Sequence, residues 1–250
     1  MRTSFFVSLL AGVMLLAGAP GYAQDVQTIL NRVAAAYKNA KSYQAQTTIT
    51  ETRQVGGQQQ KRSSTISTRF KAPNKVVTIV QGSDNLHVYS DGKTMYIYSP
   101  KEKQYMKMPA PASMAQPGAS PVGAGDPSQI GAQLQMIFGA DAKKLSDRNV
   151  DGRPMHVLQS TRTEQSEDGK SGFKVTATAY VDKATFMLRQ LTLDATQSQG
   201  TQKMTQTIVV SFASQQINPN LPDSVFVFKP PAGATERQMP APPSGPPAPR

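Results

Sequence analysis

The side chains that most often carry covalent or metal chemistry are scarce in this sequence of 250 residues. It contains no Cys, which excludes a thiolate nucleophile, a disulfide framework, an iron–sulfur cluster and a Cys-ligated zinc site. The two His residues, His87 and His156, lie far apart in the chain and do not form a His-rich metal site. We therefore expect no metal and no cofactor.

The remaining polar candidates have simpler interpretations than catalysis. Three carboxylates each precede a Gly, as is typical of turns: Asp91, Asp151 and Asp168. His156 lies within an alternating strand pattern and has no identifiable partner for general-base catalysis. Three Met residues could bind a soft metal, but no His accompanies them and Met more often fills gaps in a core: Met106, Met108 and Met114. Motifs of serine hydrolases, P-loop proteins, dinucleotide-binding proteins and zinc proteases are absent, so the sequence predicts a protein that is not an enzyme.

The first 23 residues have the pattern of a cleavable signal peptide. A basic start is followed by an apolar run over residues 5–17, which is short for a transmembrane helix, and then by small residues up to Ala23. Cleavage after Ala23 leaves Gln24 as the first mature residue; an uncleaved anchor is the alternative. No Cys follows the apolar run, so lipoprotein acylation is excluded. We expect a periplasmic protein, with an extracellular location as the less favoured alternative.

The charge of the chain is strongly positive, with 27 Lys and Arg against 16 Asp and Glu. Export argues against nucleic acid as the partner, and no RNA-binding motif is present. The positive charge could instead attract the protein to anionic membranes, although a generally basic proteome would give the same value.

Behind the leader, residues 24–234 are predicted to form one mainly β (α+β) domain. Residues 25–40 have helical spacing of apolar residues, and the pattern then changes to the alternation typical of strands. The expected strands cover residues 43–55, 60–70, 75–81, 86–90, 94–99, 104–108, 155–163, 173–181, 187–195, 203–213 and 225–228. About ten antiparallel strands predict a curled sheet or half-closed β-barrel. Residues 235–250 are rich in Pro and are expected to be a disordered tail.

A second helix is expected over residues 127–138, after a loop rich in Pro, Ala and Gly. Asp126 can cap its start and Gly139 its end. Its apolar face consists of Ile130, Leu134, Ile137 and Phe138. This helix is expected to be either a lid over a cavity or a plug of the core; pattern alone favours the plug.

Several short motifs resemble the lipoprotein carrier superfamily that includes LolA, LolB and RseB. They are Lys71-Ala72-Pro73-Asn74, the turn over residues 89–94, Tyr98-Ser99-Pro100 with Gln104, and the ending over residues 221–234. The turn over residues 149–154 is similar to an uncharacterised periplasmic branch of that superfamily. The resemblance implies a half-closed barrel with a lid helix and an apolar cavity for acyl chains. The sequence departs from the soluble carrier at Val77, where the carrier has an Arg that holds the lid.

The leading hypothesis is therefore a periplasmic carrier that binds the acyl chains of lipoproteins or other lipids. Its expected binding residues are Ile130, Leu134, Ile137 and Phe138 from the lid helix, with Val175, Ala177, Leu191, Leu193, Ile208 and Val210 from the sheet. We expect a monomer that makes transient contact with membrane-bound donor or acceptor proteins. The alternative is an envelope-stress regulator or scaffold like RseB, and a hydrolase is a third, weaker possibility.

Overall fold

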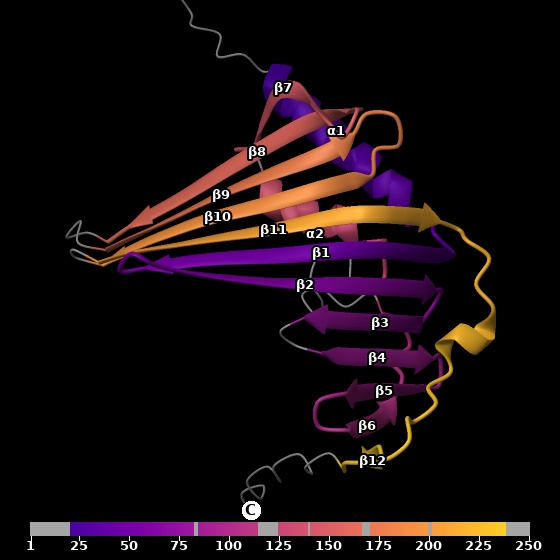
Figure 1. The fold of residues 1–250 in the computed structure, drawn as a ribbon. Coiled ribbons are helices and arrows are strands. Elements are labelled where there is room, and N and C mark those ends of the chain that lie inside the picture. Colours follow the sequence, from indigo (N-terminus) through magenta and orange to yellow (C-terminus); the bar gives the residue numbers. More distant parts are fainter. Residues whose placement is uncertain are drawn as a thin grey trace, which may run out of the picture.

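A computed structural model describes residues 21–82, 85–114, 125–139, 141–166, 171–199 and 202–238. All strands of this part belong to one twelve-stranded sheet, in the order β12-β6-β5-β4-β3-β2-β1-β11-β10-β9-β8-β7 (Figure 1). Neighbouring strands are antiparallel except β12 and β6, which run parallel. Their bounds are β1 Ser42–Val55, β2 Gln58–Lys71, β3 Lys75–Gly82, β4 Leu86–Asp91, β5 Thr94–Ser99, β6 Gln104–Pro109, β7 Lys143–Val150, β8 Arg153–Gln165, β9 Ser171–Asp182, β10 Leu188–Gln199, β11 Gln202–Ile217 and β12 Thr235–Glu236.

The sheet consists of two meanders joined along one strand pair. Strands β1 to β6 follow one another as neighbours, and so do β7 to β11. The meanders meet where β1 pairs with β11, from Tyr43 opposite Ile217 to Val55 opposite Met204. Strands β1, β2 and β8 to β11 are long and extend beyond the helices as a tapering blade (Figure 1).

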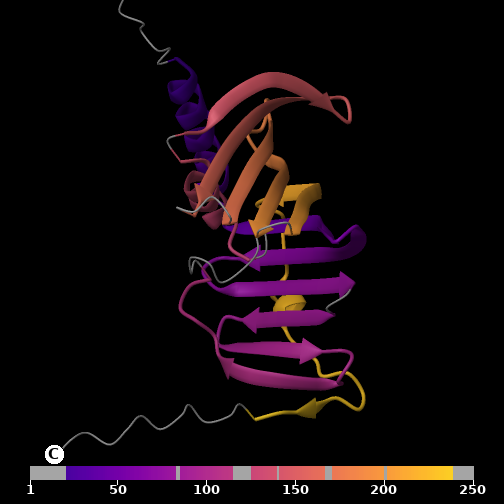
Figure 2. The same cartoon turned by 90° about the vertical axis from the view of Figure 1, so that its left-hand side faces the viewer.

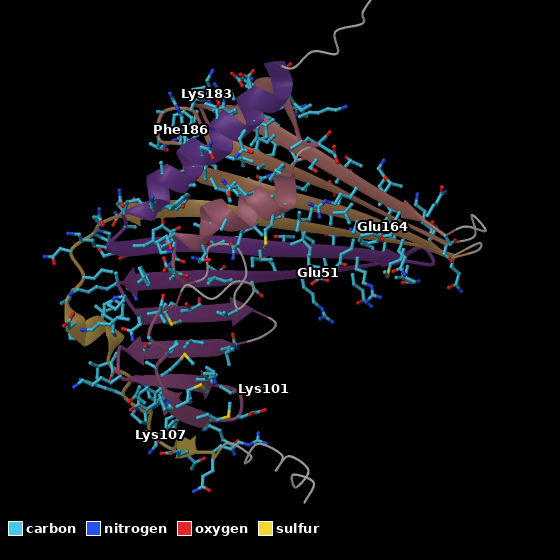
Figure 3. All side chains as sticks on the ribbon, turned by 180° about the vertical axis from the view of Figure 1, so that it is seen from behind. Glu51, Lys101, Lys107, Glu164, Lys183 and Phe186 are labelled. Carbon is cyan, nitrogen blue, oxygen red and sulfur yellow. The ribbon has the colours of Figure 1, made fainter. Side chains whose placement is uncertain are left out.

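Both helices lie on the same face of the sheet. Helix α1 (Gly21–Lys38) and helix α2 (Gln129–Phe138) pack together against β7 to β11 and β1, and none of the described residues forms a helix on this face over β3 to β6 (Figures 2 and 3). Helix α1 contacts β7 at one edge of the sheet and shares a cluster with residues of β1 and β11, so the sheet curls around this face, which we call the concave face. The helices therefore cover only part of it.

The helical spacing predicted for α1 explains its packing. Val26, Ile29, Leu30, Val33 and Tyr37 are all buried in one cluster with the apolar face of α2. The sheet contributes a row of paired residues to this cluster, since Leu158, Ala179, Leu191, Val210 and Ile49 lie opposite one another in register.

The C-terminal segment packs on the convex side of β3 to β6. The short 3-10 helix η1 (Asp223–Phe226) follows Leu221, and both Phe226 and Leu221 pack on Val77 of β3. The ring of Phe228 then lies among four tyrosines of β4, β5 and β6: Tyr89, Tyr96, Tyr98 and Tyr105.

The predicted fold class is confirmed: a curled, mostly antiparallel sheet with an N-terminal helix and a later short helix. Twelve strands are present rather than about ten, because β7, whose sequence is mostly polar, was missed and β12 was not expected. The sheet is open, with β7 and β12 at its edges. Helix α1 already starts at Gly21, so cleavage after Ala23 falls within it, and residues 1–20 of the predicted leader lie outside the described part.

Two predictions at the C-terminal end are wrong in detail. Residues 225–228 do not form a strand, because this segment crosses the convex face and places Phe226 in a cluster instead of pairing with a neighbour. The expected disordered tail does not start at Thr235, since β12 pairs with Gln104 and Tyr105 and the Arg237 amide donates to the Tyr105 carbonyl at 2.8 Å. Residues 239–250 of that tail lie outside the described part.

Candidate ligand-binding face

The expected binding residues are brought together, but as parts of a packed core. Ile130, Leu134 and Phe138 of α2 are at most 1% exposed, and Ile137 is half-buried beside them. From the sheet, the buried residues of the same cluster are Ala177, Leu191 and Val210, with Leu193 and Ile208 packed against it. Val175, one row further along the blade, is half-buried. In this conformation α2 fills the space that the lid interpretation assigned to a ligand.

Helix α2 is fixed by close contacts at both ends. A Cβ atom on Gly131 would lie 2.6 Å from the Cα and Cβ atoms of Ala34, so the two helices touch through backbone. At the other end of α2, Arg162 of β8 donates to the Met136 carbonyl at 2.8 Å. A cation is favourable there because the last carbonyls of a helix lack intrahelical partners.

Val77, at the position of the carrier's lid Arg, plays no part in holding α2. It is 2% exposed and packs against Leu221 and Phe226 on the convex face, away from both helices. The motif Lys71-Ala72-Pro73-Asn74 that precedes Val77 therefore forms a turn. The contact that holds α2 comes instead from Arg162 on another strand.

The concave side of β3 to β6 presents a second apolar surface, which we call the open face. The strand register extends the core rows across it: Ile66 is opposite Val80, which is opposite Leu86, and Val88 is opposite Ile97, which is opposite Met106. Its side chains are half-buried or, for Leu86, 38% exposed. The open face consists of Val80, Leu86, Val88, Met95, Ile97, Met106 and Met108.

The open face carries no charged side chain. On the concave side of β3 to β6, the positions between its apolar residues hold Thr78, Ser90, Ser99 and Gln104. Where this face meets the helix-covered core, the hydroxyls of Thr47 and Thr68 are buried and have no hydrogen-bond partner in the described part of the chain. The surface therefore combines apolar area with unpaired hydroxyl groups at its inner border.

The sequence analysis missed the open face for a physical reason. The alternation in residues 86–90 and 94–99 was recognised, but both faces of these strands are apolar, with tyrosines on one side and aliphatic residues on the other. Alternation alone does not say which side the C-terminal segment covers. Met106 and Met108 on either side of Lys107 were the available signal, and they were interpreted as gap fillers.

Among the described residues, no group of three or more His, Asp or Glu is close enough to hold a metal ion. Burial lowers the pKa of His87 on the convex side of β4 and raises the pKa of its neighbour Tyr89. Within the same part of the chain, no helix has the length and hydropathy required to cross a bilayer.

Comparison with known families gives a match to a model described as "Predicted periplasmic protein (DUF2092)", over residues 26–117. This agrees with the periplasmic location expected from the leader. An uncharacterized protein of Methanocaldococcus jannaschii is 24% identical over 178 residues, which is 66% of this chain and 41% of that protein. The chain thus spans about two fifths of the length of this relative.

Solved structures that match include members of the superfamily expected from the sequence. A LolA superfamily protein from Nitrosomonas europaea is 13% identical, with a TM-score of 0.30, over 81% of this chain and 97% of that chain. LprF from Mycobacterium bovis is 14% identical, with a TM-score of 0.39, over 80% and 97%. The MucA/MucB complex of Pseudomonas aeruginosa matches at 19% identity and a TM-score of 0.38, over 82% of this chain and 61% of that chain.

Proposed function

We propose that this protein is a non-enzymatic periplasmic carrier that binds the acyl chains of a lipidated ligand on the open face. The observation that carries the proposal is an uncharged apolar surface on four adjacent strands, half-exposed and continuous in register with the buried core. Each buried methylene contributes about 0.8 kcal/mol, so a single acyl chain laid along these strands supplies the affinity without any bond chemistry.

Two features of the open face support an acyl chain as the occupant. Met95, Met106 and Met108 are unbranched and flexible, and such side chains adapt to ligands of varying shape. The hydroxyls of Thr47 and Thr68 are buried at the inner border of this face, so they could donate to the ester or amide of an acyl group only if a ligand displaces the side chains that cover them. The ten residues expected from the sequence remain part of the proposal as the inner wall, which a ligand reaches only if α2 moves.

A fluorescent acyl probe tests the proposal. The wild-type protein should bind it saturably, and lipid should co-purify and be detected by mass spectrometry. Ile97→Glu places a charge at the centre of the open face and should abolish binding. Val227→Glu is the matched control, because Val227 is 48% exposed and lies outside the open face; it should bind as wild type. Absence of both co-purifying lipid and saturable binding would refute the carrier function.

A regulator or scaffold is the second candidate, and the edge strand β7 is the observation that favours it. Most of its residues are exposed, and no other strand of the described part of the chain lies on its outer side. An extended peptide could add to such an edge. Pull-down of an inner-membrane protein that is lost on Leu145→Pro, while acyl-probe binding persists, would favour the regulator over the carrier.

A further inference from the structure

A cavity of about 200 Å³ lies between the start of α1, β7 and β8, at the end of the sheet opposite the open face. Its lining includes Asp25, Ile29, Arg32, Lys144, His156 and Phe186. Figure 3 shows Phe186 and Lys183 together beside α1, far from Lys107 near the open face. The acyl-binding proposal does not use this cavity.

Phe186 is held in the cavity wall by an unusual backbone. Its φ is 55°, in the left-handed region that an aromatic residue rarely adopts. The turn that enforces it is built on Asp182, whose Oδ1 accepts the amides of Ala184 and Thr185 at 2.9 Å, and whose carbonyl accepts the Phe186 amide at 2.9 Å. Strained conformations persist only where the surroundings impose them, and they cluster at binding sites.

Two nitrogen-bearing side chains lie against the Phe186 ring. The Arg32 guanidinium carbon is 4.9 Å from the ring centroid, and the His156 ring is 5.7 Å away at an angle of 33°. Among the described residues, Arg32 has no carboxylate within ion-pair distance. With one face of the guanidinium directed to Phe186, its N–H groups around the edge stay available to a ligand.

The side chains that line the cavity carry more positive than negative charge. Asp147 is already shared by Lys183 at 2.6 Å, Lys144 at 3.0 Å and the His156 Nδ1 at 3.4 Å. The hydrogen bond from Lys183, followed by those from Lys144 and His156, keeps the pKa of Asp147 low despite partial burial. The charged groups that line the cavity are therefore Arg32 and Lys144 against Asp25, while Lys183 and Asp147, which pair with each other, are not among the lining residues.

We propose that this cavity binds a phosphate-type anion, with Arg32 as the main ligand and Lys144 as a further donor. Arginine presents parallel N–H donors that match phosphate oxygens, and hydrogen bonds between charged groups are the stronger class. Since a water molecule occupies about 30 Å³ in the liquid, the cavity has room for a phosphate group with ordered water. The phosphate could belong to a small phosphomonoester or to a phospholipid headgroup.

The two histidines of the chain provide a built-in assay, because His87 lies on β4 at the other end of the sheet. Imidazole resonances would be followed by NMR as inorganic phosphate or glycerol 3-phosphate is added at constant ionic strength. We expect a saturable shift of the His156 signal, because the His156 ring lines the cavity and a bound anion changes its electrostatic surroundings. The His87 signal should not move.

Substitutions distinguish phosphate binding in the cavity from general attraction of phosphate to a positively charged protein. Arg32→Gln should weaken phosphate binding about tenfold or more, and Lys144→Gln should weaken it while leaving the Arg32–Phe186 contact in place. Lys203→Gln removes the same charge from the far end of β11 and should leave binding unchanged. An equal response in Arg32→Gln and wild type, or equal shifts of both histidines, would overturn the proposal.

Two ligand sources are distinguished by comparing probes. Tighter binding of glycerol 3-phosphate than of inorganic phosphate, with Arg32-dependent binding to phosphatidylglycerol vesicles but not to phosphatidylcholine vesicles, would assign the site to a lipid headgroup. Saturable binding of the small phosphates without vesicle binding would assign it to a soluble phosphate compound. The result is independent of the acyl-probe assay, so failure of one proposal leaves the other standing.

Discussion

At the scale of single residues, Gln215 of β11 connects several polar groups at the border of the core. Its Oε1 accepts the hydroxyls of Tyr37 at 2.7 Å and Tyr43 at 2.9 Å, and its Nε2 donates to the Leu188 carbonyl at 2.6 Å. The Leu188 amide in turn donates to the Tyr37 hydroxyl. Burial raises the pKa of both tyrosines, which therefore remain neutral donors.

Gln215→Leu should destabilise the protein by about 2–5 kcal/mol, because each buried hydroxyl left without an acceptor costs about 1–3 kcal/mol. The free energy of unfolding in urea measures it. The matched control is Gln216→Leu, whose side chain is exposed on the next residue of β11 and should change stability little. Equal effects of the two variants would contradict the assigned network.

Asp223 makes the stability of the folded protein depend on pH in the acidic range. It is bound by Lys71 at 2.7 Å and Lys75 at 2.8 Å, and these hydrogen bonds, led by that from Lys71, lower its pKa to about 2. Because the folded pKa lies below the unfolded value, the contribution to stability is present above about pH 4 and is lost as the pH falls toward 2. Exposure of the carboxylate keeps this contribution small.

Asp223→Asn should therefore flatten the pH dependence of stability in this window. Urea midpoints measured between pH 5 and about pH 2 should converge for variant and wild type at the acidic end. A variant curve that runs parallel to the wild-type curve would show that the ion pairs with Lys71 and Lys75 do not contribute.

At the scale of elements, the contact of α2 with α1 depends on a glycine. Gly131→Ala should destabilise the protein by about 1–3 kcal/mol through overpacking against Ala34, although Ala is the better helix former by about 1 kcal/mol. The double variant Gly131→Ala with Ala34→Gly should recover part of the loss. Thermal unfolding of the two single variants and the double variant forms a cycle, and strict additivity would contradict the contact.

Helices and strands whose apolar residues recur at regular spacing were predictable from the sequence. Segments whose conformation depends on contacts with neighbouring elements were not. Helix α1 and strands β8 to β11 follow from the spacing of apolar residues in their own segments. Strand β7 was missed because its sequence, KKLSDRNV, has only two large apolar residues, and it forms because β8 offers an edge. The segment around Phe226 has strand-like residues, but its position over Val77 decides its conformation.

The sequence predicted that the candidate site is an apolar surface, but it did not predict which strands leave that surface uncovered. The sequence identified an apolar concave surface with α2 above it, and nine of its ten expected residues do meet in one cluster. It could not show that α2 fills that space, because a buried lid and a buried plug have the same amphipathic pattern. It also could not show that the helices leave β3 to β6 uncovered, since that follows from the pairing of β1 with β11.

At the scale of the whole molecule, the C-terminal segment protects one end of the sheet. Strand β12 adds to β6, and Glu236 accepts hydrogen bonds from Lys107 at 3.0 Å and Tyr105 at 3.5 Å. Without it, the outer backbone groups of β6 would be unpaired beside the apolar open face. Such edges promote pairing between molecules.

Deletion of residues 235–250 should therefore cause concentration-dependent self-association, whereas deletion of residues 239–250 should not. Sedimentation velocity over a range of protein concentrations distinguishes the two. If both truncated proteins sediment as the untruncated protein does, β12 has no protective role.

The pairing of β1 with β11 also sets the order in which the strands of the sheet can pair during folding. Strands β1 to β6 close through short hairpins, but the inner edge of β1 has no partner until Gln202–Ile217 has been synthesised and exported. Contacts between residues so distant in sequence form slowly, because a long loop must close first. A newly exported chain therefore waits with an unpaired central strand, and this interval, rather than the folded state, is when the protein is most exposed to aggregation and proteolysis.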